Sequence, residues 1–172
     1  MITHPDLHAA IQLIYEPCGL VCSNNNKEEE SEEYGASTFN LSFDSNLSRI
    51  KFRIGKITPT KIGQFVTFWK RNIDGIIIPH DFKDPFDFFV VNARKGDHFG
   101  QFVFPKEILL EEGIISNEGQ GGKLGTRIYP PWDATESKQA KKTQAWQLMH
   151  FLEFSPNESV NISKVQKLFN YQ

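Results

Sequence analysis

Strict alternation of apolar and polar residues between positions 39 and 54 constrains the fold of this chain more than any other feature. Two alternating runs, residues 39–44 and 49–54, are separated by a polar turn at Ser45 and Asn46. Successive side chains of a β-strand point to opposite faces, so the two runs predict a hairpin with one apolar and one polar face. The polar face of the second strand carries three cations, which we expect to form a basic ridge: Arg49, Lys51 and Arg53.

Basic residues are concentrated on and just after this second strand. Residues 49–72 hold seven Lys or Arg side chains and no acid, although the whole chain has 19 basic and 21 acidic residues and a net charge of −2. A cationic stretch on an otherwise acidic chain favours a negatively charged partner, most simply the phosphate backbone of a nucleic acid. The charge pattern therefore predicts a nucleic-acid partner.

Length and composition predict one domain over residues 1–172. A chain of this length with 39% hydrophobic residues, including 15 Phe, can bury a substantial core. No apolar run approaches the length of a membrane-spanning helix, and Cys18 and Cys22 are too few for a disulfide framework or a cysteine-only zinc site. We expect a cytoplasmic protein without a membrane partner, and the sequence leaves the oligomeric state open.

Periodicity and turn residues predict the remaining elements. An acidic, polar run at residues 24–33 predicts a flexible loop, and EGQGGKLG at residues 118–125 predicts a glycine-rich loop. Thr58 followed by Pro59 is a good helix start, and apolar residues at helical spacing continue the pattern to residue 71. The expected helices are 3–15, 59–71, 106–112, 135–153 and 162–170, and the further strands are 76–79, 86–93, 99–104 and 126–129.

The expected order from residue 59 to residue 129 is helix, strand, strand, strand, helix, strand. This αβββαβ order is similar to the core of the restriction-endonuclease-like superfamily, the PD-(D/E)xK nucleases. The resemblance implies an α/β (α+β) fold with a mixed central β-sheet flanked by helices, preceded here by the N-terminal helix and the β-hairpin. It also implies a Mg²⁺ or Mn²⁺ site that takes one Asp from the second strand and an acid and a Lys from the third.

Part of such a site is present in this sequence. Asp84 or Asp87 supplies the first carboxylate and Lys106 the lysine, so the catalytic candidates are Asp87 and Lys106. The position two before the lysine is Phe104, which cannot bind a hard cation, and Glu107 is the nearest replacement. The metal-ligand candidates are therefore Asp84, Asp87 and Glu107. The site belongs either to an active Mg²⁺- or Mn²⁺-dependent nuclease or to a degraded one that requires no cofactor.

A longer resemblance is to the MepB-like family. The segments that carry it are FRIGKITPTKIGQFVTFWKR, DPFDFF, GQFVFPKEIL, GTRIYPPWD and QAKKTQAWQ, which together lie between residues 52 and 147. The resemblance implies a bacterial protein with an endonuclease-like fold and a degraded catalytic site suited to holding nucleic acid. The positions that it implies to be functional are Lys56, Thr58, Thr60, Lys61, Gln64, Lys106, Arg127, Tyr129, Trp132 and Gln144.

The leading hypothesis is a nucleic-acid-binding protein whose basic ridge and neighbouring cations neutralise phosphates. Tyr129 and Trp132 are candidates to stack on unpaired bases, which would favour single-stranded DNA or RNA over a duplex. One alternative is an active metal-dependent phosphodiesterase. Another is a protein-interaction module, in which the acidic run at residues 28–33 masks the basic ridge or contacts a basic partner.

Overall fold

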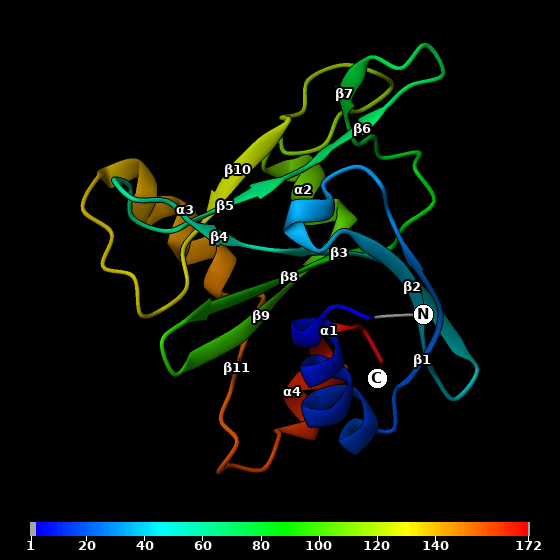
Figure 1. Cartoon of the computed structure of the whole chain (residues 1–172), viewed down its shortest axis with the longest axis vertical. Coiled ribbons are helices and arrows are strands. Elements are labelled where there is room, and N and C mark those ends of the chain that lie inside the picture. The colour runs from blue at the N-terminus through cyan, green and yellow to red at the C-terminus, as the bar shows by residue number, and fades with distance from the viewer. Residues whose placement is uncertain (1–2, 172) are drawn as a thin grey trace.

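A six-stranded mixed sheet forms the centre of the computed structural model, which describes residues 3–171 (Figure 1). The strand order is β1-β2-β3-β8-β9-β11, in which β3 and β8 run parallel and every other neighbouring pair is antiparallel. The strands are β1 (Val21–Lys27), β2 (Ser37–Phe43), β3 (Asn46–Ile54), β8 (Phe88–Lys95), β9 (His98–Pro105) and β11 (Phe151–Phe154).

Helices from the two ends of the chain cover one face of this sheet (Figure 1). The first helix begins at Pro5, where Nδ1 of His4 accepts a hydrogen bond from the backbone N–H of Asp6. Leu7 and Phe169 join the buried cluster formed with the apolar side chains of the strands. The helical elements of this layer are α1 (Pro5–Ala10), the π-helical turn η1 (Ile11–Tyr15), the 3-10 turn η2 (Glu16–Cys18) and α4 (Ile162–Leu168).

The opposite face of the sheet is apolar over β8 and β9 and polar over β2 and β3. Phe89, Val91 and Phe102 are buried there against a second layer, whereas Lys51 lies beside Phe89 in register on β3. The second layer contains a three-stranded sheet of order β10-β5-β4, a projecting two-stranded ribbon and two helices (Figure 1). Its elements are β4 (Lys56–Ile57), β5 (Gln64–Thr67), β6 (Trp69–Arg71), β7 (Ile77–Pro79), α2 (Lys106–Glu111), β10 (Gly125–Ile128) and α3 (Lys138–Leu148).

The predicted fold class is confirmed, because a mixed central sheet is flanked by helices. The hairpin at residues 39–54 is also confirmed: β2 and β3 pair antiparallel, with Phe39 opposite Ile50 and Asn40 opposite Arg49. Phe39 and Ile50 are buried on the face that the terminal helices cover. The alternating pattern therefore predicts both the pairing and the face that each side chain takes.

The predicted helix at residues 59–71 is wrong, and with it the first helix of the expected αβββαβ order. The segment forms a turn followed by β5 and β6. Gln64 and Val66 are fully buried whereas Phe65 between them is not, which is the two-residue period of a strand. Thr126 of β10 lies opposite Val66, so backbone hydrogen bonds between distant strands replace the local ones of a helix.

The predicted helix at residues 135–153 is shorter than expected. Helix α3 ends at Leu148, and the following residues form β11 at the edge of the central sheet. Phe151 is buried opposite Phe102 of β9, whereas Met149, which the helical pattern predicts to face inward, is 75% exposed. Across residues 3–171, no helix combines the length and the apolar content needed to cross a membrane.

The predicted flexible loop at residues 24–33 is also wrong. Strand β1 continues to Lys27 and pairs with β2, and a 3-10 turn, η3 (Glu32–Tyr34), follows. Tyr34 and Ser31 are buried, and Oγ1 of Thr67 lies 2.8 Å from Oγ of Ser31 in a hydrogen bond. The acidic segment therefore packs against the second layer, and we call residues 28–33 the acidic arm.

Candidate nucleic-acid interface

A polar groove of about 550 Å³ lies over β1, β2 and β3, on the face that α1 and α4 do not cover. The strand register explains its polarity, because Asn40 lies opposite Arg49 and Thr38 lies opposite Lys51. The segment at residues 70–86 supplies the other wall. The polar side chains that line this groove, called the polar groove below, are Asn24, Asn26, Thr38, Asn40, Arg49, Lys51, Lys70, His80 and Asp84.

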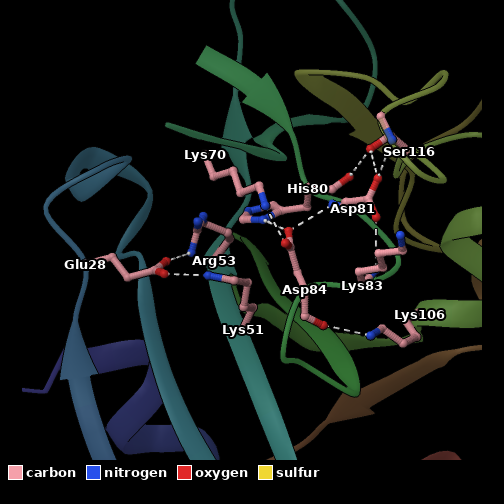
Figure 2. A network of polar contacts seen from close by, with 11 residues as sticks. Glu28, Lys51, Arg53, Lys70, His80, Asp81, Lys83, Asp84, Lys106 and Ser116 are labelled. Atoms are coloured by element: carbon pink, nitrogen blue, oxygen red, sulfur yellow. Dashed lines mark hydrogen bonds and ion pairs between the residues drawn. The ribbon is translucent and has the colours of Figure 1, made fainter. Parts of the chain in front are cut away.

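Glu28 of the acidic arm holds two cations of β3 (Figure 2). Its carboxylate accepts hydrogen bonds from Nζ of Lys51 at 2.5 Å and from the guanidinium of Arg53 at 2.7 Å. Burial raises the pKa of Glu28, but the two cations more than offset this, so its pKa lies below the ordinary value. Arg53 is only 1% exposed, and Glu28 is the counter-ion that lets a charged guanidinium remain inside the protein.

The predicted basic ridge is therefore only partly exposed. Arg49 and Lys51 line the polar groove, but Arg53 lies behind it, with its guanidinium carbon 5.4 Å from the centroid of the Phe89 ring. Strand alternation places the three cations on one face correctly, and the second layer covers the end of the strand that bears Arg53. Glu28 of the acidic run pairs with two of these cations, Lys51 and Arg53, whereas Arg49 pairs with Asp87.

Asp84 organises the opposite wall of the groove (Figure 2). Its carboxylate pairs with Lys70, accepts a hydrogen bond from the backbone N–H of Asp81 at 2.9 Å and lies 3.3 Å from Nδ1 of His80. Burial raises the pKa of Asp84, but these hydrogen bonds and the charge of Lys70 outweigh burial and hold it well below its usual range. An ionised carboxylate at Nδ1 of His80 favours the tautomer in which Nδ1–H donates and Nε2 is an acceptor.

His80 is a buried, neutral member of this wall. Burial lowers its pKa; the hydrogen bond to Asp84 acts in the opposite direction, and the nearby charges of Lys51 and Arg53 lower the pKa further. The backbone carbonyl oxygen of His80 accepts a hydrogen bond from the backbone N–H of Ser116 at 2.8 Å. The ring is thus held at Nδ1 by Asp84, and the backbone of His80 is held by Ser116.

Asp81 ties the glycine-rich loop to the same wall (Figure 2). Its carboxylate accepts hydrogen bonds from Oγ of Ser116 at 2.6 Å, from the backbone N–H of Gly119 at 3.0 Å and from the backbone N–H of Lys83 at 3.0 Å. These hydrogen bonds lower the pKa of Asp81 to about 2. The loop predicted at residues 118–125 therefore supports the groove wall from outside.

The carboxylates predicted to bind a metal do not converge. Asp87 is held by Arg49, whose Nε and terminal nitrogen donate at 3.1 and 3.0 Å and whose backbone N–H donates at 2.7 Å. Asp84 is committed to the cations of its own wall, and Glu107 is exposed in the first turn of α2. Across residues 3–171, no group of three His, Cys, Asp or Glu side chains is placed to hold a metal ion. The candidate ligands therefore do not fit a site for Mg²⁺ or Mn²⁺.

The predicted catalytic lysine supports the groove wall from below. Nζ of Lys106 donates a hydrogen bond to the backbone carbonyl oxygen of Asp84 at 2.8 Å (Figure 2). The same ammonium lies 5.1 and 4.9 Å from the ring centroids of Phe82 and Phe86, close enough for cation–π attraction. Lys106 therefore fixes the turn that carries Asp84 and does not line the polar groove.

Several residues implied by the family resemblance lie in a turn at residues 56–63, apart from the polar groove. Arg127 donates hydrogen bonds to Oγ1 of Thr58 at 2.6 Å and to the carbonyl oxygen of Gly63 at 3.2 Å, so Thr58 accepts from an arginine and does not cap a helix. Lys56 pairs with a carboxylate of the acidic arm at 2.9 Å. Two further predicted residues are exposed around a hollow of about 560 Å³: Thr60 and Lys61.

Four other predicted residues lie in or beside the second layer. Gln64 is fully buried and donates a hydrogen bond to a backbone carbonyl of β8, and Gln144 donates to backbone carbonyls of the loop before α3. The ring of Trp132 stacks on that of His98 with centroids 5.0 Å apart, and Tyr129 lines a separate hollow beside α3. The structure therefore does not bring Tyr129 or Trp132 to the polar groove.

Sequence reasoning misses important members of the polar groove. The sequence pattern assigns Lys70 to a helix and shows His80 only as a histidine near a strand. It also assigns the asparagines at positions 24 and 26 to a loop. The acids that precede the basic strand in the sequence indicate that one of them pairs with its cations. Only the reversal of the chain between β1 and β2, however, places Glu28 beside Lys51.

Comparisons with known proteins find one family and solved structures that resemble this chain. The MepB-like family model matches residues 28–153. A crystal structure of MepB is similar with a TM-score of 0.73 and 29% sequence identity, over 91% of this chain and 99% of that chain. The structure of a bacterial homing endonuclease is similar with a TM-score of 0.47 and 13% identity, over 84% of this chain and 86% of that chain. No curated protein matches the chain.

Proposed function

The chain belongs to the MepB-like family, and we propose that it binds a single nucleic-acid strand by its phosphates in the polar groove without cutting it. The observation that carries the proposal is the gathering of Arg49, Lys51 and Lys70 in one groove whose lining contains a single carboxylate, that of Asp84. Lysine and arginine side chains that converge in this way are the usual protein ligands of phosphate oxygens.

Neutral hydrogen-bonding groups and a few apolar side chains make up the rest of the lining. Asn24 and Asn26 come from β1, and Thr38 and Asn40 come from β2. An asparagine amide both donates and accepts, so these side chains suit the sugars and base edges of a strand whose phosphates lie on the cations. RNA offers an additional 2′-hydroxyl to such groups, which DNA lacks.

The dimensions of the groove favour a single strand over a duplex. Its volume of about 550 Å³ is that of a site for a small ligand. Walls from the β1–β3 face and from residues 70–86 enclose it, so a flexible strand can follow the floor whereas a stiff duplex meets only the rim. Tyr129 and Trp132 lie outside the groove, so the preference for a single strand rests on the shape of the groove and not on stacking.

The cations of the groove retain their carboxylate partners, which sets the expected strength of binding. Arg49 pairs with Asp87, and Lys70 pairs with Asp84. A phosphate must therefore share each cation with an acid, so we expect modest affinity that falls steeply with salt. The same pairing supports binding without cleavage, because carboxylates committed to cations are not available as ligands of a divalent metal.

Fluorescence anisotropy of a labelled single-stranded RNA, measured in EDTA at a series of salt concentrations, tests the proposal. Three groove cations predict a log–log slope of about −2, from roughly 0.7 per neutralised phosphate on a single strand. Single-stranded DNA and a duplex of the same sequence are measured in parallel. No binding to any of them at low salt would overturn the proposal, and cleavage after addition of Mg²⁺ or Mn²⁺ would overturn the claim that the strand is left intact.

Single substitutions locate the binding surface. Arg49→Gln and Lys70→Gln should each weaken binding several-fold and reduce the slope by roughly 0.7, because each removes one phosphate contact. Lys142→Gln, on the exposed side of α3, is the matched control and should change neither quantity. Equal effects of all three substitutions would indicate a diffuse charge effect and contradict the assignment to the polar groove.

A further inference from the structure

The tip of the β6–β7 ribbon presents three isoleucines to solvent, called the isoleucine tip below. Ile73 is fully exposed, and Ile76 and Ile77 are 58% and 40% exposed. The ribbon projects from the second layer (Figure 1), and a Cβ built on Gly75 between these side chains meets no atom within 4 Å. Single exposed apolar side chains are ordinary on a protein surface, but three within five residues on a projecting turn indicate a contact surface.

Hydrogen bonds within the turn fix the shape of the isoleucine tip. Oδ1 of Asn72 accepts hydrogen bonds from the backbone N–H of Asp74 at 3.0 Å and from that of Ile76 at 2.9 Å. The backbone carbonyl oxygen of Asn72 accepts from the N–H of Gly75 at 3.0 Å, and the guanidinium of Arg71 donates to the carbonyl oxygen of Gly75 at 2.8 Å. A ligand therefore meets a turn that is already in place, so binding costs little ordering entropy on the protein side.

The base of the ribbon carries a cation on each of its two faces. Lys70 lines the polar groove. Alternation along β6 turns Arg71 to the other face, where it lies opposite Ile77 and its guanidinium carbon is 5.4 Å from the centroid of the Trp69 ring. The ribbon is therefore a continuation of the groove wall, cationic at its base and apolar at its tip.

Charge along the ribbon determines which part of a nucleic acid meets the tip. Asp74 is the only acid among residues 69–79. Phosphates are attracted by Lys70 and Arg71 and repelled by Asp74, so a strand held at the base of the ribbon offers its bases to the tip. Isoleucine is among the apolar side chains that proteins insert between bases. A second copy of the chain fits less well, because a stable dimer buries about 800 Å² per partner, far more than three side chains provide.

We propose that the isoleucine tip packs against unstacked bases of the strand whose phosphates lie in the polar groove. Ile73 lies three residues beyond Lys70, at most about 10 Å along the chain, so one strand reaches both. The bases of a single strand are free to turn toward the tip, whereas those of a duplex are paired and stacked. The inference rests on the proposed function and adds a surface that contacts bases to the one that contacts phosphates.

The test compares a labelled single-stranded DNA with an abasic strand of the same length, which keeps the phosphates and lacks the bases. Ile73→Ser should raise the Kd for the intact strand about five- to tenfold, because an isoleucine loses part of its burial. It should leave the salt slope and the Kd for the abasic strand unchanged, because no phosphate contact is lost. Ile162→Ser is the matched control, since Ile162 is 47% exposed on α4, on the opposite face of the central sheet, and should change none of these quantities.

Three results would overturn this inference and leave the proposed function standing. The first is an unchanged Kd of Ile73→Ser for the intact strand, and the second is an equal rise for the intact and abasic strands, which would show a contact with the backbone. The third is a wild-type dimer, seen by size-exclusion chromatography, that Ile73→Ser dissociates, which would assign the tip to a second copy. No binding of either strand by the wild type overturns both proposals. Thermal melting confirms that each variant is folded.

Discussion

Glu28 contacts two cations that differ in their exposure. The side chain of Lys51 is 15% exposed and that of Arg53 is 1% exposed, and the carboxylate between them is 20% exposed. A cation that is nearly free of water needs a counter-ion more than one at the surface does, because it has lost more of its hydration. Glu28 is therefore a structural residue for Arg53 and a competitor of phosphate for Lys51.

Substitution Glu28→Gln should destabilise the protein and strengthen strand binding at the same time. The free energy of unfolding should fall by about 2–3 kcal/mol, because a buried guanidinium loses its ion-pair partner, and the pair is incompletely buried. Urea unfolding measures the first effect and anisotropy the second. Glu29→Gln, exposed on the same arm, is the control, and an equal loss of stability in both variants would contradict this role.

Asp87 is the acid whose removal should most simply strengthen phosphate binding. Its carboxylate accepts hydrogen bonds from Nε and from a terminal nitrogen of Arg49. Asp87→Asn keeps the shape of the side chain but removes its charge, which frees the guanidinium for a phosphate. We expect a several-fold lower Kd for single-stranded RNA and a steeper salt slope. Asp44→Asn, in the β2–β3 turn, is the comparison, and a Kd unchanged in Asp87→Asn would contradict the role of Arg49.

At the scale of elements, residues 59–71 are the segment where a substitution best distinguishes the observed turn and strands from the predicted helix. Gly63 has a φ of 83°, and a Cβ there would lie 2.7 Å from the carbonyl oxygen of Ile128. Gly63→Ala should therefore lower the free energy of unfolding by at least about 1–3 kcal/mol, whereas the same change inside an exposed helix would raise it by about 1 kcal/mol. Thermal or urea unfolding measures the sign.

Gly75, at the tip of the β6–β7 ribbon, provides the control for Gly63. It has a φ of 77°, but a Cβ built on it meets nothing within 4 Å. Gly75→Ala should therefore show the cost of the left-handed backbone alone, which is smaller than strain and collision together. A larger loss of stability at Gly75 than at Gly63 would contradict the described turn.

The elements that could be predicted are those whose pattern is local. Alternation specifies β2 and β3, and the polar turn between residues 94 and 98 marks the β8–β9 hairpin. Residues 59–71 have apolar side chains that fit both a helical and a strand period, and only pairing with β10, far along the chain, decides between them. The acidic arm is polar in sequence yet packed in the structure, because its partners lie on other strands.

The same distinction holds for the candidate site. Arg49 and Lys51 are predictable, since the period of one strand places both on one face. Lys70 and His80 are not, because Lys70 lies on β6, inside the segment whose apolar spacing mimics a helix, and His80 follows β7, which pairs with β6. The ion pairs of Arg53 depend on burial by the second layer, which no local pattern shows.

At the scale of the whole molecule, the ion pairs make stability depend on pH. In the folded protein the pKa values of five carboxyl groups lie below their ordinary values, so their stabilisation is complete above about pH 5 and is lost as pH falls through the lowered values. His80 is held neutral with a lowered pKa, so below about pH 6.5 the unfolded chain takes up its proton first and stability also falls. The five groups are Glu28, Asp81, Asp84, Asp87 and the fully exposed Glu32.

Thermal melting across acid pH measures this dependence. We expect Tm to fall gently from about pH 7 to pH 5 as the His80 contribution is lost, and steeply below about pH 4 as the carboxylates are protonated. Asp84→Asn should flatten the steep part, because one lowered carboxyl group is removed. A Tm that rises as the pH falls from 7 to about 4 would contradict the directions of these pKa shifts.

The order of the strands along the chain has a consequence for synthesis. Strands β1, β2 and β3 follow one another and pair antiparallel, whereas β8, the parallel neighbour of β3, is separated from it by the whole of residues 55–87. Such a nonlocal pairing forms late in folding, because a long loop must first be closed. The acidic arm precedes the basic strand, so Glu28 can shield Lys51 and Arg53 as soon as that strand leaves the ribosome, among ribosomal RNA, before the second wall of the groove exists.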